Sequence, residues 1–133
     1  MNVIRTSTPV DIAVSGLKAE SLRMNVIAEN IANASTTRTP SGSPYRRQEV
    51  VLSTKDGVSG VAVNQVAPDL SQYKRVYQPG HPDADKDGYV LMPNVELPVE
   101  MINMVTASRA YQANAAVMKR TQELNDVAME LLK

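Results

Sequence analysis

The chain has 133 residues, with 14 basic against 14 acidic side chains and a formal net charge of zero. This balance predicts no nucleic-acid surface, because phosphate binding depends on an excess of Lys and Arg. The chain contains no Cys, which excludes disulfides, thiolate nucleophiles and thiolate metal sites. Its aromatic residues make up 4% and are all Tyr, beside seven Met. This composition favours helix interfaces over a thick globular core.

The apolar runs are too short to insert into a membrane. No stretch reaches the roughly 18 consecutive apolar residues that a membrane span needs. The first apolar run carries Asp11 and Lys18, and no charged region of the secretory type precedes it. The sequence therefore predicts a protein that is either cytoplasmic or exported without a cleaved signal.

A first helix is predicted from about Val10 to Ala32. Thr8 would be its N-cap, Pro9 would occupy the first helical position, and Asp11 would place a carboxylate near unpaired amide groups. Asn33 would end the helix, because Asn tolerates the left-handed conformation common at helix C-termini.

Apolar residues recur along this helix at helical spacing. One line, in sevens, is Val10, Leu17, Met24 and Ile31, and a second is Ile12, Ala19 and Val26. Gly16 has two interpretations. It is either a tolerated weak point, costing about 0.5–1 kcal/mol against Ala, or a position where a neighbouring helix approaches closely.

The middle of the chain is rich in helix breakers. Seven of the eight prolines and five of the six glycines lie between Pro40 and Pro98. They predict short strands and turns. We expect strands at residues 45–53, 61–67, 73–77 and 89–92, with the Asp56-Gly57 turn between the first two.

The last third of the chain predicts a second, longer helix. Its N-cap is either Asn94 or Leu97, the latter with Pro98 at the first helical position, and Val99 to Leu132 contains neither Pro nor Gly. A continuous helix over these 34 residues would be about 51 Å long. A compact domain of this chain length is only about 36 Å across. The helix should therefore extend past the rest of the molecule.

Two adjacent apolar lines follow this helix. They are Leu97, Met104, Tyr111, Met118 and Leu132, interrupted by Asn125, and Ala110, Val117, Leu124 and Leu131, preceded by Asn103. A band of this width can contact two partners. Because the chain has nothing of its own to cover it, we infer that other chains do. Asn103 and Asn125 are candidates for fixing the register of helices, as polar residues do in coiled coils.

Catalytic and metal-binding patterns are weak. His81 is the only His and has no neighbouring nucleophile or metal ligand. Asp83, Asp85 and Asp87 copy the first half of a calcium-binding loop, D-x-D-x-D-G. The twelfth position is Asn94, where such a loop needs a bidentate Glu. We therefore predict no cofactor and no metal, with these three Asp as weak candidates for calcium.

Four segments resemble a known family. Residues 12–36 (IAVSGLKAESLRMNVIAENIANAST) and 100–118 (EMINMVTASRAYQANAAVM) are similar to the terminal signatures of bacterial flagellar rod and hook proteins. Residues 44–51 (PYRRQEVV) and 77–101 are similar to the short members of the proximal rod. The signature positions in this chain are Ser15, Gly16, Leu17, Arg23, Asn25, Asn30, Ala32, Asn33, Glu100, Met101, Met104, Ala107, Ser108, Arg109, Tyr111, Ala113 and Asn114.

This resemblance implies a structural protein and not an enzyme. Its terminal helices would pair and pack against neighbouring subunits in the inner tube of a helical assembly, with the central insert outside. It implies type III export without signal cleavage and a periplasmic rod that transmits torque. The expected partners are copies of itself, other rod proteins, the export apparatus and the base that joins the rod to the inner-membrane ring.

The predicted fold is mainly α with a small β insert. A helical arm at 1–39 packs with a second arm at 94–133, and a β-containing insert at 40–93 separates them. The predicted assembly interface comprises Leu17, Met24, Asn25, Ile31, Asn33, Met104, Arg109, Tyr111, Asn114, Val117, Met118 and Leu124. Two alternatives remain open at this point: a calcium-binding module and a small helical adaptor that folds as a compact monomer.

Overall fold

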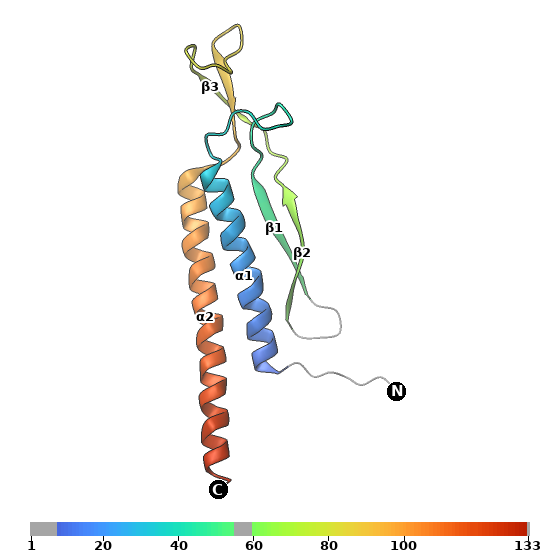
Figure 1. The fold of residues 1–133 in the computed structure, drawn as a ribbon, viewed down its shortest axis with the longest axis vertical. Helices are drawn as coiled ribbons and strands as arrows, with labels where there is room; N and C mark the ends of the chain where they lie inside the picture. The colour runs from blue at the N-terminus through green and yellow to red at the C-terminus, as the bar shows by residue number, and fades with distance from the viewer. Residues whose placement is uncertain (1–7, 55–59, 133) are drawn as a thin grey trace, which may run out of the picture.

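The computed structural model describes residues 8–54 and 60–132, so the predicted Asp56-Gly57 turn lies outside the described residues. Two long helices run side by side, and two antiparallel strand pairs are attached to them (Figure 1). The elements in order are α1 (Pro9–Ala32), β1 (Gln48–Thr54), β2 (Val61–Pro68), β3 (Lys74–Tyr77), β4 (Tyr89–Met92) and α2 (Leu97–Glu130). The predicted fold class is confirmed.

The start of α1 agrees with the sequence prediction. Thr8 is the N-cap: its side-chain oxygen accepts a hydrogen bond from the Asp11 amide at 3.2 Å, and the Asp11 carboxylate accepts one from the Thr8 amide at 3.0 Å. Asn33 ends the helix, as expected, but the expected left-handed conformation is wrong. Its φ is −102°, and its side-chain amide instead donates to the Glu29 carbonyl at 3.0 Å.

The start of α2 differs from both predicted alternatives. The helix begins at Leu97 with Glu96 as N-cap, and Pro98 occupies the second helical position. Glu96 makes no side-chain capping bond, and Pro98 reduces the need for one because it has no amide hydrogen. Asn94 is not the cap, because its side chain binds the backbone of Arg47 and Asp69.

The four predicted strands are present with small changes in bounds. β1 pairs with β2, with Val50 opposite Val66 and a register shift between Val51 and Leu52. β3 pairs with β4, with Lys74 opposite Met92. The first strand begins at Gln48 and not at the expected residue 45, because Tyr45 and Arg47 bond side chains of the helices instead. Figure 1 shows the first pair alongside α1 and the second pair beyond the ends of the helices.

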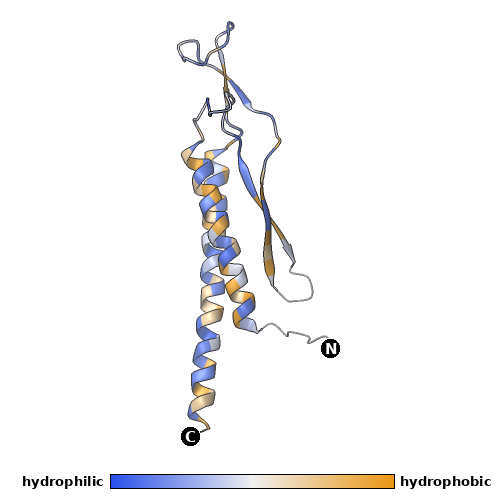
Figure 2. Ribbon diagram, turned by 45° about the vertical axis from the view of Figure 1, so that its right-hand side comes forward, coloured by the Kyte–Doolittle hydropathy of each residue, from blue (hydrophilic) through white to orange (hydrophobic). Residues whose placement is uncertain are grey.

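The core is thin and contains small side chains. Among the described residues, its buried apolar members are Ala13, Ala19, Val26, Ile27, Val90, Val95 and Ala107. Small residues allow the helices to approach closely but bury little area each. Hydrophobic residues recur along α2 (Figure 2), and many of them are exposed.

Two contacts set the register of the antiparallel helices. Asn30 bonds Glu100 near one end, and Gly16 lies against Asn114 further along. The separation along α1 from Asn30 to Gly16 equals that along α2 from Glu100 to Asn114. In this register α1 begins level with Thr121, so residues 122–132 extend past it (Figure 1). We call residues 122–132 the overhang.

In the described part of the chain, no helix combines the length and hydrophobicity needed to cross a bilayer.

Candidate assembly interface

A buried polar cluster joins the two helices to the β strands. Glu100, in the first turn of α2, is fully buried. Its carboxylate accepts hydrogen bonds from Arg47 Nε at 2.7 Å and from Asn30 Nδ2 at 3.3 Å. A carboxylate is favoured in the first turn of a helix, where the amide groups carry partial positive charge. The cluster therefore connects the end of α1, the chain before β1 and the start of α2.

Arg47 is held from several sides. Its Nη1 lies 3.4 Å from the Asp69 carboxylate, and its amide donates to Asn94 Oδ1 at 2.9 Å. Burial alone would lower the pKa of Arg47, but the hydrogen bond to Glu100 and the surrounding carboxylates raise it. Hydrogen bonds from the backbone amide of Ser71, and then from its side chain, lower the pKa of Asp69. Arg47 lowers this pKa further. Both side chains therefore remain charged at neutral pH.

Two side chains of α1 attach the β1–β2 pair to the helix. The Asn30 carboxamide bonds both backbone groups of Gln48: Nδ2 donates to the carbonyl and Oδ1 accepts from the amide, each at 2.9 Å. It occupies the outer edge of β1 as a neighbouring strand would. Near the other end of α1, Ser15 Oγ accepts from the Val61 amide at 3.1 Å. The strands are thus held along α1 at two points.

Tyr45 completes the cluster. Its hydroxyl donates to Asn30 Oδ1 at 3.0 Å. Burial, followed by the charges of Glu29 and Glu100, raises the pKa of Tyr45. The hydroxyl therefore remains a donor at neutral pH.

The close approach predicted at Gly16 is observed. A Cβ at this position would lie 2.6 Å from Asn114 Nδ2 and 2.9 Å from its Cγ. Real Cβ atoms do not come this close to neighbouring atoms, so the missing side chain is what admits Asn114. The neighbour is α2 of the same chain, and the interpretation of Gly16 as a tolerated weak point is set aside.

The predicted interface residues fall into two groups. Half-buried members lie along the helix pair: Leu17, Met24, Ile31, Asn33, Met104, Asn114 and Met118. Exposed members are Asn25, Arg109, Tyr111, Val117 and Leu124. Their role in contacts between subunits stays a prediction.

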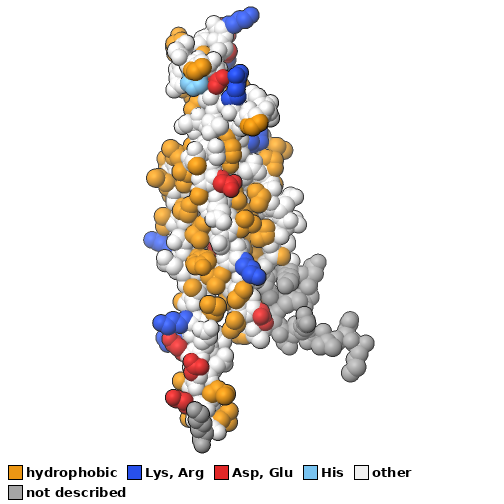
Figure 3. All heavy atoms as spheres, in the orientation of Figure 1, with side chains coloured by type: hydrophobic (Ala, Val, Ile, Leu, Met, Phe, Trp, Pro, Cys, Tyr) orange, Lys and Arg blue, Asp and Glu red, His pale blue; other side chains and the backbone are white. Residues whose placement is uncertain are grey.

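The overhang carries an uncovered apolar strip. Leu124 is 69% exposed and Leu131 is 82% exposed, with Val127 and Met129 also exposed between them. Figure 3 shows hydrophobic side chains over the paired helices and again at the lower end of α2. A single protomer therefore leaves a large part of its apolar surface in contact with water.

The Asp83–Asp87 turn is organised without a metal. Asp85 accepts from the amides of Asp87 and Tyr89 and pairs with Arg75 at 3.0 Å. The backbone amide of Tyr89 is the main reason that the pKa of Asp85 is lowered.

Asp83 is engaged elsewhere, by the Thr37 hydroxyl at 2.8 Å and by Arg38. Among the described residues, no three His, Cys, Asp or Glu side chains converge as a metal site would require. The weak calcium assignment to Asp83, Asp85 and Asp87 thus gains no support from their geometry.

Sequence reasoning missed which polar residues are buried. It favoured Asn103 and Asn125, but Asn103 is only half-buried and Asn125 is exposed, whereas Asn30 is fully buried. Glu100 was a signature position whose burial and partner were not predicted. Its partner Arg47 lies far away in the sequence, so helical spacing could not indicate the pair. The available signal was a carboxylate in the first turn of the helix, within the apolar stretch from Leu97 to Met104.

Two family profiles match the two arms. Residues 11–38 match the profile described as "Flagella basal body rod protein", and residues 86–131 match "Flagellar basal body rod FlgEFG protein C-terminal". The matched segments contain nearly all of α1 and the whole of α2, together with Asn30 and Glu100 of the buried cluster. The chain thus belongs to the flagellar basal-body rod proteins, which confirms the family resemblance seen in the sequence.

Its relatives within that class are FlgC proteins. The chain is 39% identical to "Flagellar basal-body rod protein FlgC" of Borreliella burgdorferi, over 93% of this chain and 95% of the relative. It is 47% identical to the FlgC of Yersinia enterocolitica and 44% identical to that of Salmonella typhimurium, each over 86% of this chain and 88% of the relative.

These relationships define a structural rod subunit of the bacterial flagellar basal body and not an enzyme. The predictions of function class and of the basal body as its location are confirmed. The calcium-binding alternative finds no support among the relatives.

Proposed function

We propose that α1 and α2 form one segment of a tube wall, in which each subunit covers apolar surface that its neighbour leaves open. The overhang is the observation that carries this proposal, because its apolar strip has no partner within the described protomer. Each large apolar side chain that becomes fully buried contributes about 1.5–3 kcal/mol. A strip of several such side chains repeated in every subunit would favour assembly strongly.

The buried cluster would keep the strand pairs at a fixed angle to the helices. Torque on a rod subunit tends to rotate its outer parts against its inner wall. Glu100, Arg47 and Asn30 join helices and strands through short, charge-assisted hydrogen bonds, which prefer narrow geometries. This arrangement supports a role in transmitting torque across the periplasm.

The more detailed location and partners of the subunit are proposed from its family. We propose export through the flagellar type III apparatus without signal cleavage and a periplasmic position in the proximal rod. The neighbours would be copies of this chain, other rod proteins and the base that joins the rod to the inner-membrane ring. The names of the relatives, which specify the basal-body rod, support this placement.

The test is Leu124→Asp in cells that carry no other copy of the subunit. Leu124 is exposed in the protomer, so the substitution should leave the urea midpoint of the purified chain unchanged. In an assembled wall it would bury a charge, and we expect loss of basal bodies and of swimming. Met104→Asp should also abolish assembly, but Met104 is half-buried in the protomer, so its effect on folding is harder to separate.

Gln122→Asp is the matched control, because it adds the same charge to an exposed polar position of the overhang. It should preserve swimming. Normal basal bodies with Leu124→Asp would refute the role of the overhang in assembly.

A further inference from the structure

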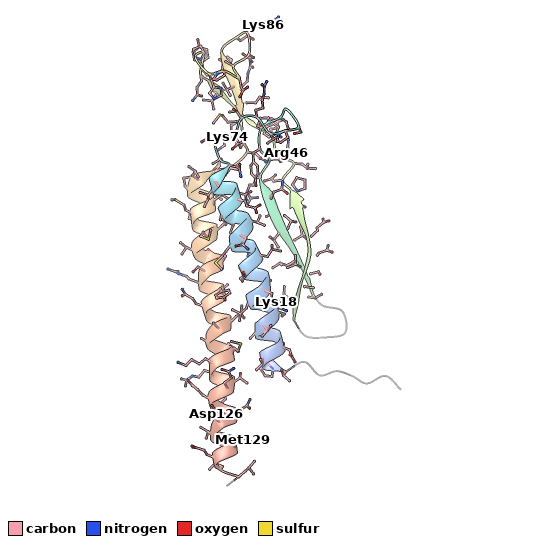
Figure 4. The ribbon with its side chains drawn as sticks, viewed as in Figure 1. Lys18, Arg46, Lys74, Lys86, Asp126 and Met129 are labelled. Carbon is pink, nitrogen blue, oxygen red and sulfur yellow. The ribbon has the colours of Figure 1, made fainter. Side chains whose placement is uncertain are left out.

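A shallow groove of about 370 Å³ lies along α1 beside Tyr111 of α2, well away from the overhang. Its lining comprises Leu17, Lys18, Ser21, Leu22, Asn25 and Tyr111. Leu17 and Leu22 give it an apolar floor, while Lys18 is exposed and adds one positive charge. Figure 4 shows Lys18 on the lower half of α1. The groove therefore suits an apolar helix that carries acidic side chains.

The overhang has this chemistry. Its three charged residues are Glu123, Asp126 and Glu130, all acidic, and they follow one another at helical spacing. The apolar strip of Leu124, Val127 and Leu131 lies beside them. Figure 3 shows the acidic side chains gathered near the lower end of α2, next to hydrophobic ones. Glu123 pairs with Arg120 of the same helix at 3.2 Å, whereas in the described part of the chain Lys18, Asp126 and Glu130 form no ion pair, so Asp126 and Glu130 carry the charge that Lys18 would meet.

The groove cannot receive the overhang of its own chain. In the helix register set by Gly16 and Asn114, Ser21 in the groove lies level with Arg109 of α2. From Arg109 to Val127, in the middle of the overhang, a straight helix rises about 27 Å. Because α2 is one continuous helix, the overhang cannot fold back over that distance. Only another molecule can fill the groove in this way.

We infer that the overhang of one copy packs into the α1 groove of a second copy displaced by about 27 Å along the helix axis. The apolar strip of the overhang packs against the apolar floor of the groove in the second copy. Lys18 of the groove then faces the acidic side chains of the overhang. The groove and the overhang are different surfaces, so the contact between two copies is heterologous. Each added copy therefore presents a free groove or a free overhang to which a further copy can bind. A contact of this kind propagates around a helix. The inference rests on the proposed function and names the surfaces that carry it out.

A cysteine pair tests the contact directly, because the natural chain has no Cys. Ser21→Cys and Val127→Cys in one chain place a thiol on each surface, too far apart to bridge within a protomer. After mild oxidation of isolated basal bodies, we expect covalent dimers and longer chains on a non-reducing gel. Chains with either substitution alone should remain monomeric.

A basal body that contains the double variant and yields only monomer would overturn this contact. The proposed rod role would then still stand, because the subunit would have been incorporated. This separates failure of the further inference from failure of the proposed function, which the Leu124→Asp variant tests.

A charge exchange gives an independent result that does not need oxidation. Lys18→Asp should lower the amount of subunit in basal bodies several-fold, because it faces acidic residues, and Asp126→Lys in the same chain should restore it. Lys86→Asp, at the exposed tip of the β3–β4 pair (Figure 4), is the control and should have no effect. An unchanged level with Lys18→Asp, or a loss that Asp126→Lys does not restore, contradicts the inference.

Discussion

Glu100 and Asn30 are polar residues in the most buried part of the protomer. Burying a carboxylate is costly unless its oxygens are paired, and here Arg47 and Asn30 supply the hydrogen bonds. Asn30 uses both ends of its carboxamide, since Nδ2 donates to Gln48 and Glu100 while Oδ1 accepts from Gln48 and Tyr45. Such a cluster specifies one arrangement of helices and strands, because any other leaves a buried polar group unpaired.

Glu100→Gln tests this cluster. The substitution keeps the size of the side chain but removes the charge opposite Arg47. We expect a loss of about 2–4 kcal/mol in the free energy of unfolding, measured by urea titration followed by circular dichroism. Glu130→Gln in the exposed overhang is the control and should change stability by less than about 0.5 kcal/mol. Equal effects of the two substitutions would mean that the buried charge is unimportant.

The pH dependence of stability should report on Asp69. Its pKa in the folded state lies below the ordinary value of 3.8, so the unfolded chain takes up the proton first as the pH falls. The stabilisation is therefore complete above about pH 4 to 5 and disappears as the pH drops through the folded-state pKa. We expect Asp69→Asn to reduce stability at pH 7 and to make less difference by pH 3. A difference that stays constant over this range contradicts the assignment.

The elements themselves follow local rules. The capping box of α1, the breakers of the middle segment and the uninterrupted apolar period of α2 each predicted an element close to its observed bounds. The error at the start of α2 arises because distant residues compete for a local capping group. Asn94 would cap α2 by local rules, but it binds Arg47 and Asp69 instead.

Gly16→Ala tests how the helices contact each other. By helix propensity alone, Ala should stabilise α1 by about 0.5–1 kcal/mol. In this protein the new methyl group would collide with Asn114, so we expect no gain or a net loss near 1 kcal/mol. In an Asn114→Ala background the collision is gone, and Gly16→Ala should then stabilise.

The four unfolding free energies form a double-mutant cycle. The same effect of Gly16→Ala in both backgrounds would show that the side chain of Asn114 does not limit the approach of the helices.

At the scale of the whole molecule, the protomer is elongated and lacks a complete core. The overhang extends past α1 (Figure 1) and exposes Leu124 and Leu131. An isolated helix end of this length gains little stability by itself. Its sequence is therefore better explained by contacts made after assembly than by the stability of the protomer.

Removal of residues 123–133 separates these two roles. The truncated chain should keep the urea midpoint of the full chain, because the described residues of the overhang are all exposed. It should fail to enter basal bodies, as judged by immunoblotting of the isolated structures. A clear drop in the urea midpoint would instead assign these residues to the protomer fold.

The sequence alone determined the elements, the mainly helical fold class and the excess of apolar surface, because helix caps, breakers and apolar spacing act over a few residues. It also carried the resemblance that the relatives confirm. The tertiary structure decided which polar residues are buried, how the helices are aligned and where α2 becomes uncovered. These properties depend on contacts such as Arg47 with Glu100 and Gly16 with Asn114. Residues far apart in the chain can recognise each other only after the helices have packed.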